Sequence, residues 1–232
     1  MVFCIEDQVR WRSIPDEPAY TRPSRFKTSE SDPVCKTNRS GKSATLTKHQ
    51  VEIFCSNLPQ KYSLLAELLY YSAGRVKEIT TIRVRNINFK DGMVTLEKSS
   101  TKTKETRQVP LPPTVLKNLA SWIDSHGLKT DDYIFFTNSR NIKVKAGSKA
   151  VTTQPVDSFF RKAFDWNGIL GASTHSFRRS RLTHLHIEEK WSLREIMDIS
   201  GHKNLLSLQQ YLDTDKNATF EKYRDLFVRE GV

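Results

Sequence analysis

A histidine and a tyrosine stand nine positions apart near the end of the chain, in the stretch GHKNLLSLQQYL. Gly201 allows the chain to turn sharply after a helix, so that His202 projects from a tight corner. Leucines at helical spacing follow, which predicts a short helix with His202 at one end and Tyr211 at the other. A phenol can act as a nucleophile and an imidazole can bind or move a proton. Taken alone, the pair is better explained by a packed core tyrosine and a histidine that caps a helix.

A second candidate pair lies upstream, in THSFRRSRLTH. His175 and Arg178 are three residues apart, which places them on one face of a helix that Thr174 can cap. A histidine and a guanidinium together at the start of a helix suit a phosphate group. The alternative is a solvated basic helix, because Arg179 and Arg181 accompany the pair.

Two further charged positions precede these helices. Arg75 follows a glycine, Gly74, that is expected to end a buried helix, and Glu78 comes three residues later. An ion pair between them could hold the guanidinium in place, although an ordinary surface salt bridge would contribute little stability. Lys102 lies on the predicted tip between two strands, in STKTKE.

In chain order the candidate residues are Arg75, Lys102, His175, Arg178, His202 and Tyr211. This order resembles the tyrosine recombinases of the phage integrase family. Their signature is A/T-G-x-R-x-x-E, a lysine on a β-hairpin, H-x-x-R, G-H, and a tyrosine nine residues beyond that histidine. The matching text is SAGRVKE, STKTKETRQVP, HSFR, GH and the tyrosine of QQYL, within a resemblance that covers about residues 45–229. Arg179 departs from the family, which often has histidine there.

The resemblance implies a site-specific DNA recombinase or integrase that cleaves and rejoins DNA. Tyr211 would attack a phosphorus atom and form a 3′-phosphotyrosine, which conserves bond energy and allows religation without ATP. Arg75 and Arg178 would bind the phosphate oxygens, because guanidinium groups are planar, permanently charged donors. These two cations would replace metal ions, so no metal and no cofactor is expected.

The resemblance also assigns the proton transfers. His175 is the candidate base for the Tyr211 hydroxyl, whose ordinary pKa of about 10 makes it a weak nucleophile at neutral pH. His202 would donate a hydrogen bond to a phosphate oxygen, and Lys102 would protonate the leaving 5′ oxygen. Glu78 would orient Arg75 without touching the phosphate.

The elements that position these residues are expected to form an α+β catalytic domain, mostly helical, with a small three-stranded antiparallel sheet. Strands are expected at 81–89, 93–99 and 106–112, with Asp91-Gly92 as the first hairpin turn. A short strand is expected at 133–136. Helices are expected at about 47–54, 62–74, 114–127, 154–164, 175–188, 193–200, 204–212 and 217–229. Capping boxes at Thr47–Gln50 and Ser192–Glu195 begin two of these helices.

Residues 1–44 mix proline, serine, threonine and charged residues with no sustained apolar period, which predicts a flexible polar arm ahead of a catalytic domain at 45–232. Gly41 and the following Lys-Ser do not form a P-loop, because Lys36 stands where that loop needs its first glycine. Full-length family members carry a helical core-binding domain. The arm is too short and too polar to be one, so the chain is expected to be an excised catalytic domain or a minimal relative.

Composition narrows the setting and the partners. The net charge of +11 favours a polyanion, and the resemblance implies double-stranded DNA and a tetramer assembled on it. No apolar run is long enough for a membrane span, and no signal peptide is visible. Cys4, Cys35 and Cys55 match neither zinc spacing nor a disulfide framework, so an intracellular, DNA-associated location is expected.

Two alternatives stay open at this point. A type IB topoisomerase uses the same phosphotyrosine chemistry to relax supercoils, but such enzymes tend to have lysine where this chain has His175. A catalytically idle DNA-binding relative would be expected to lack one of the reactive residues, and all of them are present.

Overall fold

The structure of the protein is a computed structural model, and it describes residues 41–97, 105–137, 145–212 and 216–230. Within these ranges the α-helices are α1 (Lys48–Ser56), α2 (Gln60–Tyr71), α3 (Val76–Thr80), α4 (Pro113–Ser125), α5 (Thr153–Trp166), α6 (Thr174–Ile187), α7 (Leu193–Ser200), α8 (Leu205–Gln209) and α9 (Lys216–Glu230). The expected α+β class, mostly helical with one small antiparallel sheet, is confirmed.

The sheet contains β1 (Ile87–Asn88), β2 (Met93–Leu96) and β3 (Arg107–Pro110), in the order β1-β2-β3 with antiparallel pairing. Val94 of the central strand pairs with Ile87 on one side and Val109 on the other. All three side chains are buried, so one face of the sheet covers the core. The predicted second strand, 93–99, extends past the end of β2 into residues 98–104. These residues, which connect β2 to β3, lie outside the described residues.

Two strand predictions are wrong in extent. The first predicted strand, 81–89, contains only the two residues of β1, because Val84–Asn86 form a 3₁₀ turn (η1). Residues 133–136 join no sheet and form only isolated bridges, Arg83 with Tyr133 and Phe136 with Ala150. Alternating apolar residues are typical of strands, but a segment without a neighbouring strand cannot form a ladder.

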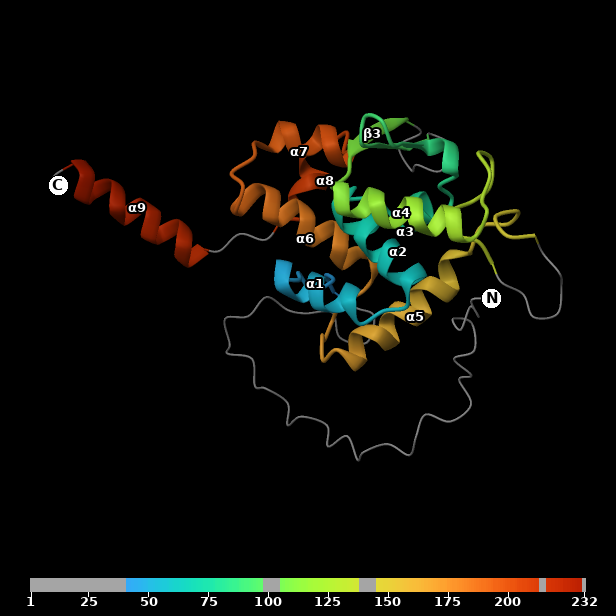
Figure 1. The fold of residues 1–232 in the computed structure, drawn as a ribbon. Coiled ribbons are helices and arrows are strands. Elements are labelled where there is room, and N and C mark those ends of the chain that lie inside the picture. The colour runs from blue at the N-terminus through green and yellow to red at the C-terminus, as the bar shows by residue number, and fades with distance from the viewer. Residues whose placement is uncertain (1–40, 98–104, 138–144, 213–215, 231–232) are drawn as a thin grey trace, which may run out of the picture. The chain divides into compact units, whose positions relative to one another are not determined.

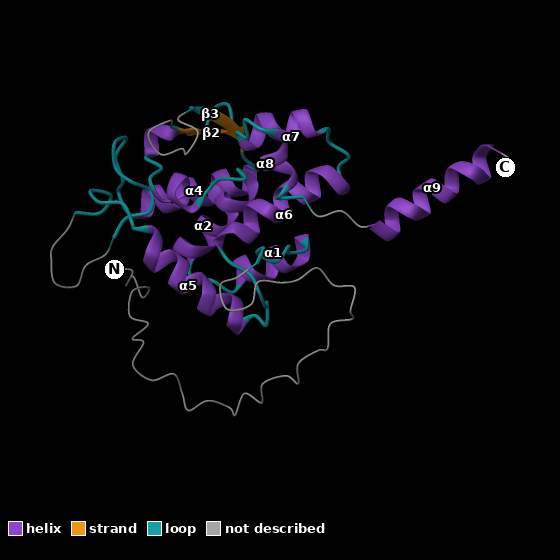
Figure 2. Ribbon diagram, turned by 180° about the vertical axis from the view of Figure 1, so that it is seen from behind, coloured by secondary structure: helices purple, strands orange, loops and turns teal. Residues whose placement is uncertain are grey.

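Helix α2 lies in the middle of the helical layer, as Figure 1 shows, and it contacts α1, α3, α4 and α6. Its sequence is apolar on nearly all sides, and its leucines are fully buried accordingly. A cluster of phenylalanines joins α1, α5 and α6, in which the rings of Phe54 and Phe164 stack with centroids 4.3 Å apart. The strands lie at one edge of this helical body beside α7, as Figure 2 shows from behind.

The helix caps follow the sequence at two of three predicted positions. Thr47 with Gln50, and Ser192 with Glu195, form the predicted capping boxes of α1 and α7. The third prediction is wrong: Thr174 is the first residue of α6 rather than its cap. Its hydroxyl instead donates to Asp157 Oδ1 of α5 at 2.6 Å, which ties the start of α6 to α5.

Residue Ser173 is the N-cap of α6, and its backbone amide donates to Ser176 Oγ at 3.0 Å. Ser43 Oγ lies 2.7 Å from Ser173 Oγ, and the Ala44 amide donates to the Gly171 carbonyl at 3.0 Å. The last residues of the predicted arm therefore contact the start of α6, whereas residues 1–40 lie outside the described residues. In the described part of the chain, no helix has the length and apolar character needed to cross a bilayer.

Candidate active site

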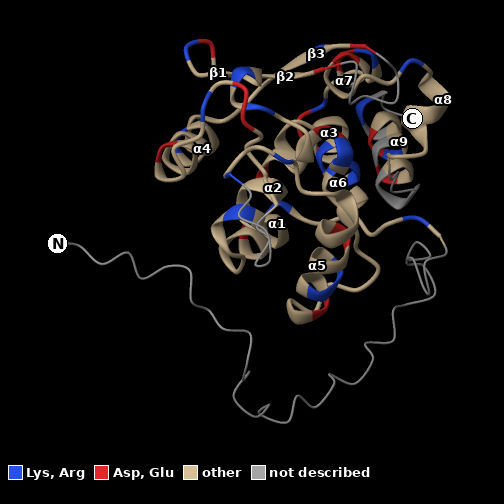
Figure 3. Cartoon of the chain, turned by 90° about the vertical axis from the view of Figure 1, so that its right-hand side faces the viewer, with Lys and Arg blue, Asp and Glu red and all other residues tan. Residues whose placement is uncertain are grey.

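The guanidinium of Arg178 is buried, with 1% of the residue exposed. It lies on α6, and its Nη1 donates to the carbonyl of Ala73 while its Nη2 donates to the carbonyl of Ser200 at 2.9 Å. These two carbonyls belong to the α2–α3 turn and to the end of α7, so one side chain joins three segments. For Arg178 the alternative of a solvated basic helix is wrong. Figure 3 shows the run of basic residues on α6 in blue.

The turn between α2 and α3 presents the Ala73 carbonyl. Helix α2 ends at Tyr71, and Ala73 then takes a left-handed backbone conformation with φ 47°, which is uncommon for a residue with a side chain. This position corresponds to the glycine of the A/T-G-x-R signature. Gly74 was expected to end this helix, but the helix ends earlier, at Tyr71. A Cβ at Gly74 would lie 2.6 Å from Ile79 Cδ1 and 2.8 Å from Ser72 Oγ, so both side chains would have to shift to admit one.

The carboxylate of Glu78 binds two guanidinium groups. Its Oε1 lies 2.8 Å from Arg75 Nη1, and its Oε2 lies 2.7 Å from Arg107 Nη2 and accepts from the Arg75 amide at 3.1 Å. The predicted Arg75–Glu78 pair is present, and Glu78 is buried rather than on the surface. Burial would raise the pKa of the Glu78 carboxyl, but Arg107 and then Arg75 outweigh burial and hold that pKa below its ordinary value.

Sequence analysis did not identify Arg107, the first residue of β3. The available signal is an arginine at the start of the strand that follows the predicted basic tip. Alternation along the strand places Arg107 on the same face as the buried Val109. The sequence does not reveal that its partner is Glu78, which lies 29 positions away.

His202 is buried, with 7% exposed, between Arg178 and the end of α7. Its Nδ1 lies 2.7 Å from Ser200 Oγ, and its Nε2 lies 3.2 Å from Arg178 Nη2. Burial first, and the charge of Arg178 next, lower the pKa of His202 to about 3. The imidazole is therefore neutral near pH 7. Gly201 before it has φ 68°, so the predicted left-handed stop of α7 is confirmed.

The buried neutral imidazole should make the folded protein lose stability in acid. The pKa of His202 is about 3 in the folded chain and 6.5 at its ordinary value, so the unfolded chain binds more protons between these limits. Stability is therefore lost as the pH falls below about 6.5, and the His202 contribution at pH 5 is about 2 kcal/mol. The free energy of unfolding, measured with urea, should fall between pH 7.5 and pH 5.0. The fall should be about 2 kcal/mol larger in the natural protein than in His202→Asn. Equal drops in the two proteins would contradict the assignment of a buried neutral imidazole.

Tyr211 lies against this cluster. Its ring centroid is 5.1 Å from that of His202, and the Arg178 guanidinium carbon is 5.5 Å from the same ring. The side chain is half-buried, so one side of the ring packs and the other is open. A phenol between an imidazole and a buried cation has the surroundings that covalent chemistry on an anionic substrate needs.

The segment that carries Tyr211 is held by contacts with α8 and by two side chains of α6. Helix α8 ends at Gln209, earlier than the predicted residue 212, and Tyr211 follows it with its amide donating to the Leu208 carbonyl at 2.8 Å. Of the three leucines predicted to form the apolar face, Leu208 and Leu212 are buried, whereas Leu205 is 41% exposed. Two side chains of α6 reach this segment: Thr183 Oγ1 donates to the Tyr211 carbonyl and Arg179 Nη1 to the Gln210 carbonyl, both at 3.3 Å.

The structure thus brings Arg75, Glu78, Arg178, His202 and Tyr211 together, and adds Arg107. Burial first, and then the charges of Arg75 and Arg107, lower the pKa of Arg178. His175 lies one turn before Arg178 in α6 and is exposed. Lys102 lies outside the described residues, so its predicted place on a hairpin tip stays a prediction.

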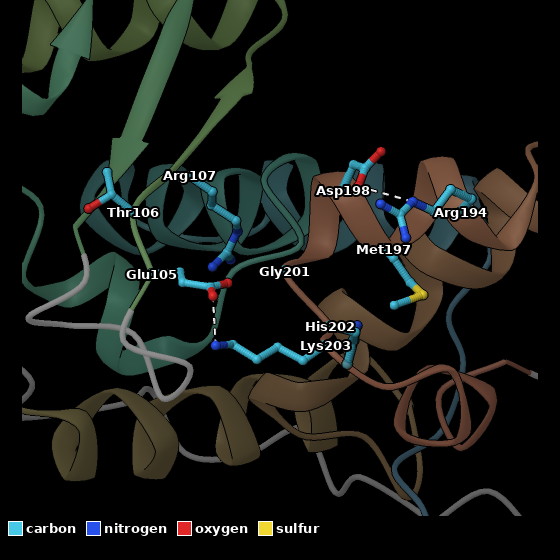
Figure 4. Close-up of a pocket in the computed structure, with 9 residues that line it drawn as sticks. All are labelled: Glu105, Thr106, Arg107, Arg194, Met197, Asp198, Gly201, His202 and Lys203. Carbon is cyan, nitrogen blue, oxygen red and sulfur yellow. Dashed lines mark ion pairs between the residues drawn. The ribbon is translucent and has the colours of Figure 1, made fainter.

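A cavity of about 390 Å³ opens beside this cluster, as Figure 4 shows. It is lined by Glu105, Thr106, Arg107, Arg194, Met197, Asp198, Gly201, His202 and Lys203. An ion pair of 2.6 Å between Glu105 and Lys203 joins the segment before β3 to the residue after His202. Among the described residues, no group of three or more histidine, cysteine, aspartate or glutamate side chains is arranged to hold a metal ion.

Comparisons with known proteins show the family of the chain. The family model described as "Phage integrase family" matches residues 44–218. The chain is 30% identical over 159 residues to the tyrosine recombinase XerC of Pelobacter propionicus, covering 68% of this chain and 49% of that protein. It is 28% identical over 172 residues to the tyrosine recombinase XerA of Pyrococcus furiosus, covering 72% of this chain and 56% of that protein. The chain therefore spans about half the length of these curated relatives.

Solved structures share the fold. The crystal structure of XerA recombinase superposes with a TM-score of 0.65 at 19% identity, over 80% of this chain and 66% of that one. The Tn1549 transposon integrase in complex with a circular intermediate DNA gives a TM-score of 0.61 at 15% identity, over 80% of this chain and 67% of that one. With the family model matching most of its length, the chain belongs to the phage integrase family, the tyrosine recombinases.

Proposed function

We propose that this chain cleaves and rejoins double-stranded DNA in site-specific recombination, through a 3′-phosphotyrosine on Tyr211 and without metal or ATP. The observation that carries the proposal is the Tyr211 ring packed against His202 and Arg178 in a cluster of three arginines. Two structural neighbours support DNA as the substrate. The Tn1549 integrase was solved with a circular intermediate DNA, and the XerH recombinase with its difH substrate.

The arginines suit the charge that develops during phosphoryl transfer. Attack by a phenolate concentrates negative charge on the phosphate oxygens, which fixed guanidinium groups stabilise without reorganising. Arg178 is held by two backbone carbonyls and Arg75 by Glu78, so both are positioned before DNA binds.

The neutral state of His202 suits a hydrogen-bond donor. If the Ser200 hydroxyl donates to Nδ1, the imidazole proton is on Nε2, from which it can be donated to a phosphate oxygen. His175, which is exposed at the start of α6, is the proposed base for the tyrosine proton. Lys102 is the proposed acid for the leaving 5′ oxygen, and Glu78 orients Arg75.

Cleavage should not need a divalent cation, because the arginines supply the positive charge that a metal would otherwise provide. A nicked suicide DNA substrate carrying the recombination site of the chain, mixed with the full chain, should give the same yield of covalent adduct in EDTA as in magnesium. Denaturing gels measure the adduct, and a reaction without protein gives the background. Cleavage that occurs only with magnesium would refute the metal-free mechanism.

Residues 1–44 are proposed to be a polar arm ahead of the catalytic domain, and the action is proposed to take place on intracellular DNA. The active assembly is proposed to be a tetramer on DNA, with α9 as the contact between subunits. Helix α9 carries Phe220, Tyr223, Leu226 and Phe227, all exposed, and the rings of Tyr223 and Phe227 pack with centroids 4.8 Å apart. Exposed aromatic residues clustered on one helix are typical of a protein contact.

Deleting residues 216–232 should abolish assembly on a two-arm DNA site and leave cleavage of a single site within about threefold, because the apolar contact is lost while the catalytic cluster is kept. Native gels measure assembly, and suicide substrates measure cleavage. A variant with Arg224→Ala, which changes an exposed charge on the same helix, is the control and should assemble normally. Assembly that survives the deletion, or a domain that unfolds without α9, would contradict this role.

A further inference from the structure

Arg107 joins strand β3 to the buried carboxylate that orients Arg75. We propose that Arg107 is a positioning residue for DNA cleavage, which acts through Glu78 to fix Arg75 and to anchor the strand that follows the Lys102 segment. This inference rests on the proposed function. It adds a residue that neither the recombinase signature nor the comparisons identify.

The geometry of Glu78 shows why one arginine alone would leave it incompletely held. Arg75 Nη1 binds Oε1 at 2.8 Å, and Arg107 Nη2 binds Oε2 at 2.7 Å. Without Arg107, Oε2 would keep only the Arg75 amide, at 3.1 Å, among its hydrogen-bond donors in the described structure. A buried carboxylate that loses a charged partner is left poorly compensated, and it can turn about its last bond. Arg75 would then lose the fixed direction of its guanidinium.

The glycine of the G-H pair leaves room for this arginine. A Cβ at Gly201 would lie 3.2 Å from Arg107 Cδ and 3.3 Å from Arg107 Nη1, so the Arg107 side chain lies directly over the Gly201 backbone. Figure 4 shows Arg107 reaching from β3 toward Gly201 at the edge of the cavity. Gly201 therefore serves two needs: it takes the left-handed conformation that ends α7, and it lets β3 approach the loop that carries His202.

The pairing of Arg107 with Glu78 favours an indirect role. The Arg107 side chain is 9% exposed, whereas that of Arg75 is 19% exposed, although the two bind the same carboxylate. One end of the Arg107 guanidinium is already bound to Glu78, and its Nε is buried without a hydrogen-bond partner in the described structure. Arg75 is thus the member of the pair with more surface open to a phosphate. Arg107 follows Lys102 by five residues in the sequence, so the anchor lies at the base of the segment that carries the proposed acid.

The test is a double-mutant cycle on the full chain, with Arg107→Ala, Glu78→Gln and the two combined. Single-turnover adduct formation is measured at saturating suicide DNA, alongside the dissociation constant for DNA and the melting temperature. Arg194→Ala is the matched control, because Arg194 lines the same cavity, carries the same charge and is exposed. Arg107→Lys tests whether a positive charge at this position rescues the rate.

We expect Arg107→Ala to lower the saturated cleavage rate by about 10- to 100-fold, as loss of an orienting partner commonly does. The dissociation constant should change no more than in Arg194→Ala, and Arg107→Lys should recover part of the rate. In the Glu78→Gln background, Arg107→Ala should change the rate by less than about threefold, because Arg107 then has no carboxylate to act through. If Arg107→Ala does not fold, the cleavage rates of Arg107→Gln and Arg107→Lys are compared instead. Arg107→Gln is expected to be the slower of the two.

Two results would overturn the inference. The first is a cleavage rate for Arg107→Ala equal to that of Arg194→Ala. The second is a double mutant whose loss of rate equals the product of the losses in Arg107→Ala and Glu78→Gln. The latter would mean that Arg107 contacts the phosphate directly. A readout without DNA separates this inference from the proposed function. Spectra of protein with ¹⁵N-labelled arginine should show the Arg75 side-chain signal, assigned with Arg75→Lys, shifting in Arg107→Ala and not in Arg194→Ala. An unshifted signal would overturn the positioning role even if the natural chain cleaves DNA.

Discussion

Replacing Arg178 with lysine should lower single-turnover DNA cleavage by about a thousandfold or more, since a preorganised donor to the developing charge is lost. The guanidinium donates through Nη1 to the Ala73 carbonyl and through Nη2 to the Ser200 carbonyl, so its plane is fixed by two separate segments. One ammonium group cannot satisfy both carbonyls and also present a planar pair of donors to a phosphate. The positive charge is kept, so the loss would come from geometry.

The same substitution elsewhere in α6 is the control. Arg181 lies three residues further on, over the rings of Tyr70 and Tyr71 and outside the cluster. Arg181→Lys should change the cleavage rate by less than about threefold. Melting temperatures show whether Arg178→Lys remains folded at the assay temperature. A folded Arg178→Lys variant that cleaves at the natural rate would show that this guanidinium does not bind the transition state.

The second large effect is expected at the nucleophile. Tyr211→Phe removes one oxygen atom and keeps the ring that packs against His202 and Arg178, so the fold and DNA binding should be preserved. Without the hydroxyl no phosphotyrosine can form, and the adduct should fall below detection. Denaturing gels of suicide-substrate reactions measure this loss.

The matched control is Tyr223→Phe in α9, which makes the same change at an exposed tyrosine. This variant should form as much adduct as the natural chain. If Tyr211→Phe still forms the adduct and Tyr223→Phe does not, the nucleophile has been assigned to the wrong tyrosine.

The sequence was most informative where a local interaction decides the structure. The capping boxes at Thr47 and Ser192 and the left-handed Gly201 depend on a few neighbouring residues, and all three are present. The predicted strands at 81–89 and 133–136 were wrong in extent because a strand also needs a partner, and pairing is decided by residues far away in the chain. Residues 98–104, with Lys102, and residues 1–40 lie outside the described part of the structure.

The same distinction applies to the site. The family signature identified which side chains do chemistry, but it did not reveal how they are held. Arg107 reaches Glu78 from 29 positions away, and Arg178 reaches Ala73 from 105 positions away. Neither contact has a local pattern in the sequence. The left-handed Ala73 was also unexpected, because glycine is the residue that normally marks such a position.

The most direct test of the account is to locate the covalent bond. The natural chain is incubated in EDTA with a nicked suicide DNA that traps the cleaved strand, the adduct is digested, and the modified peptide is sequenced by mass spectrometry. The account predicts one modified peptide, with the 3′-phosphate of the cleaved strand joined to Tyr211. A bond to any other residue, or to a 5′-phosphate, would contradict it.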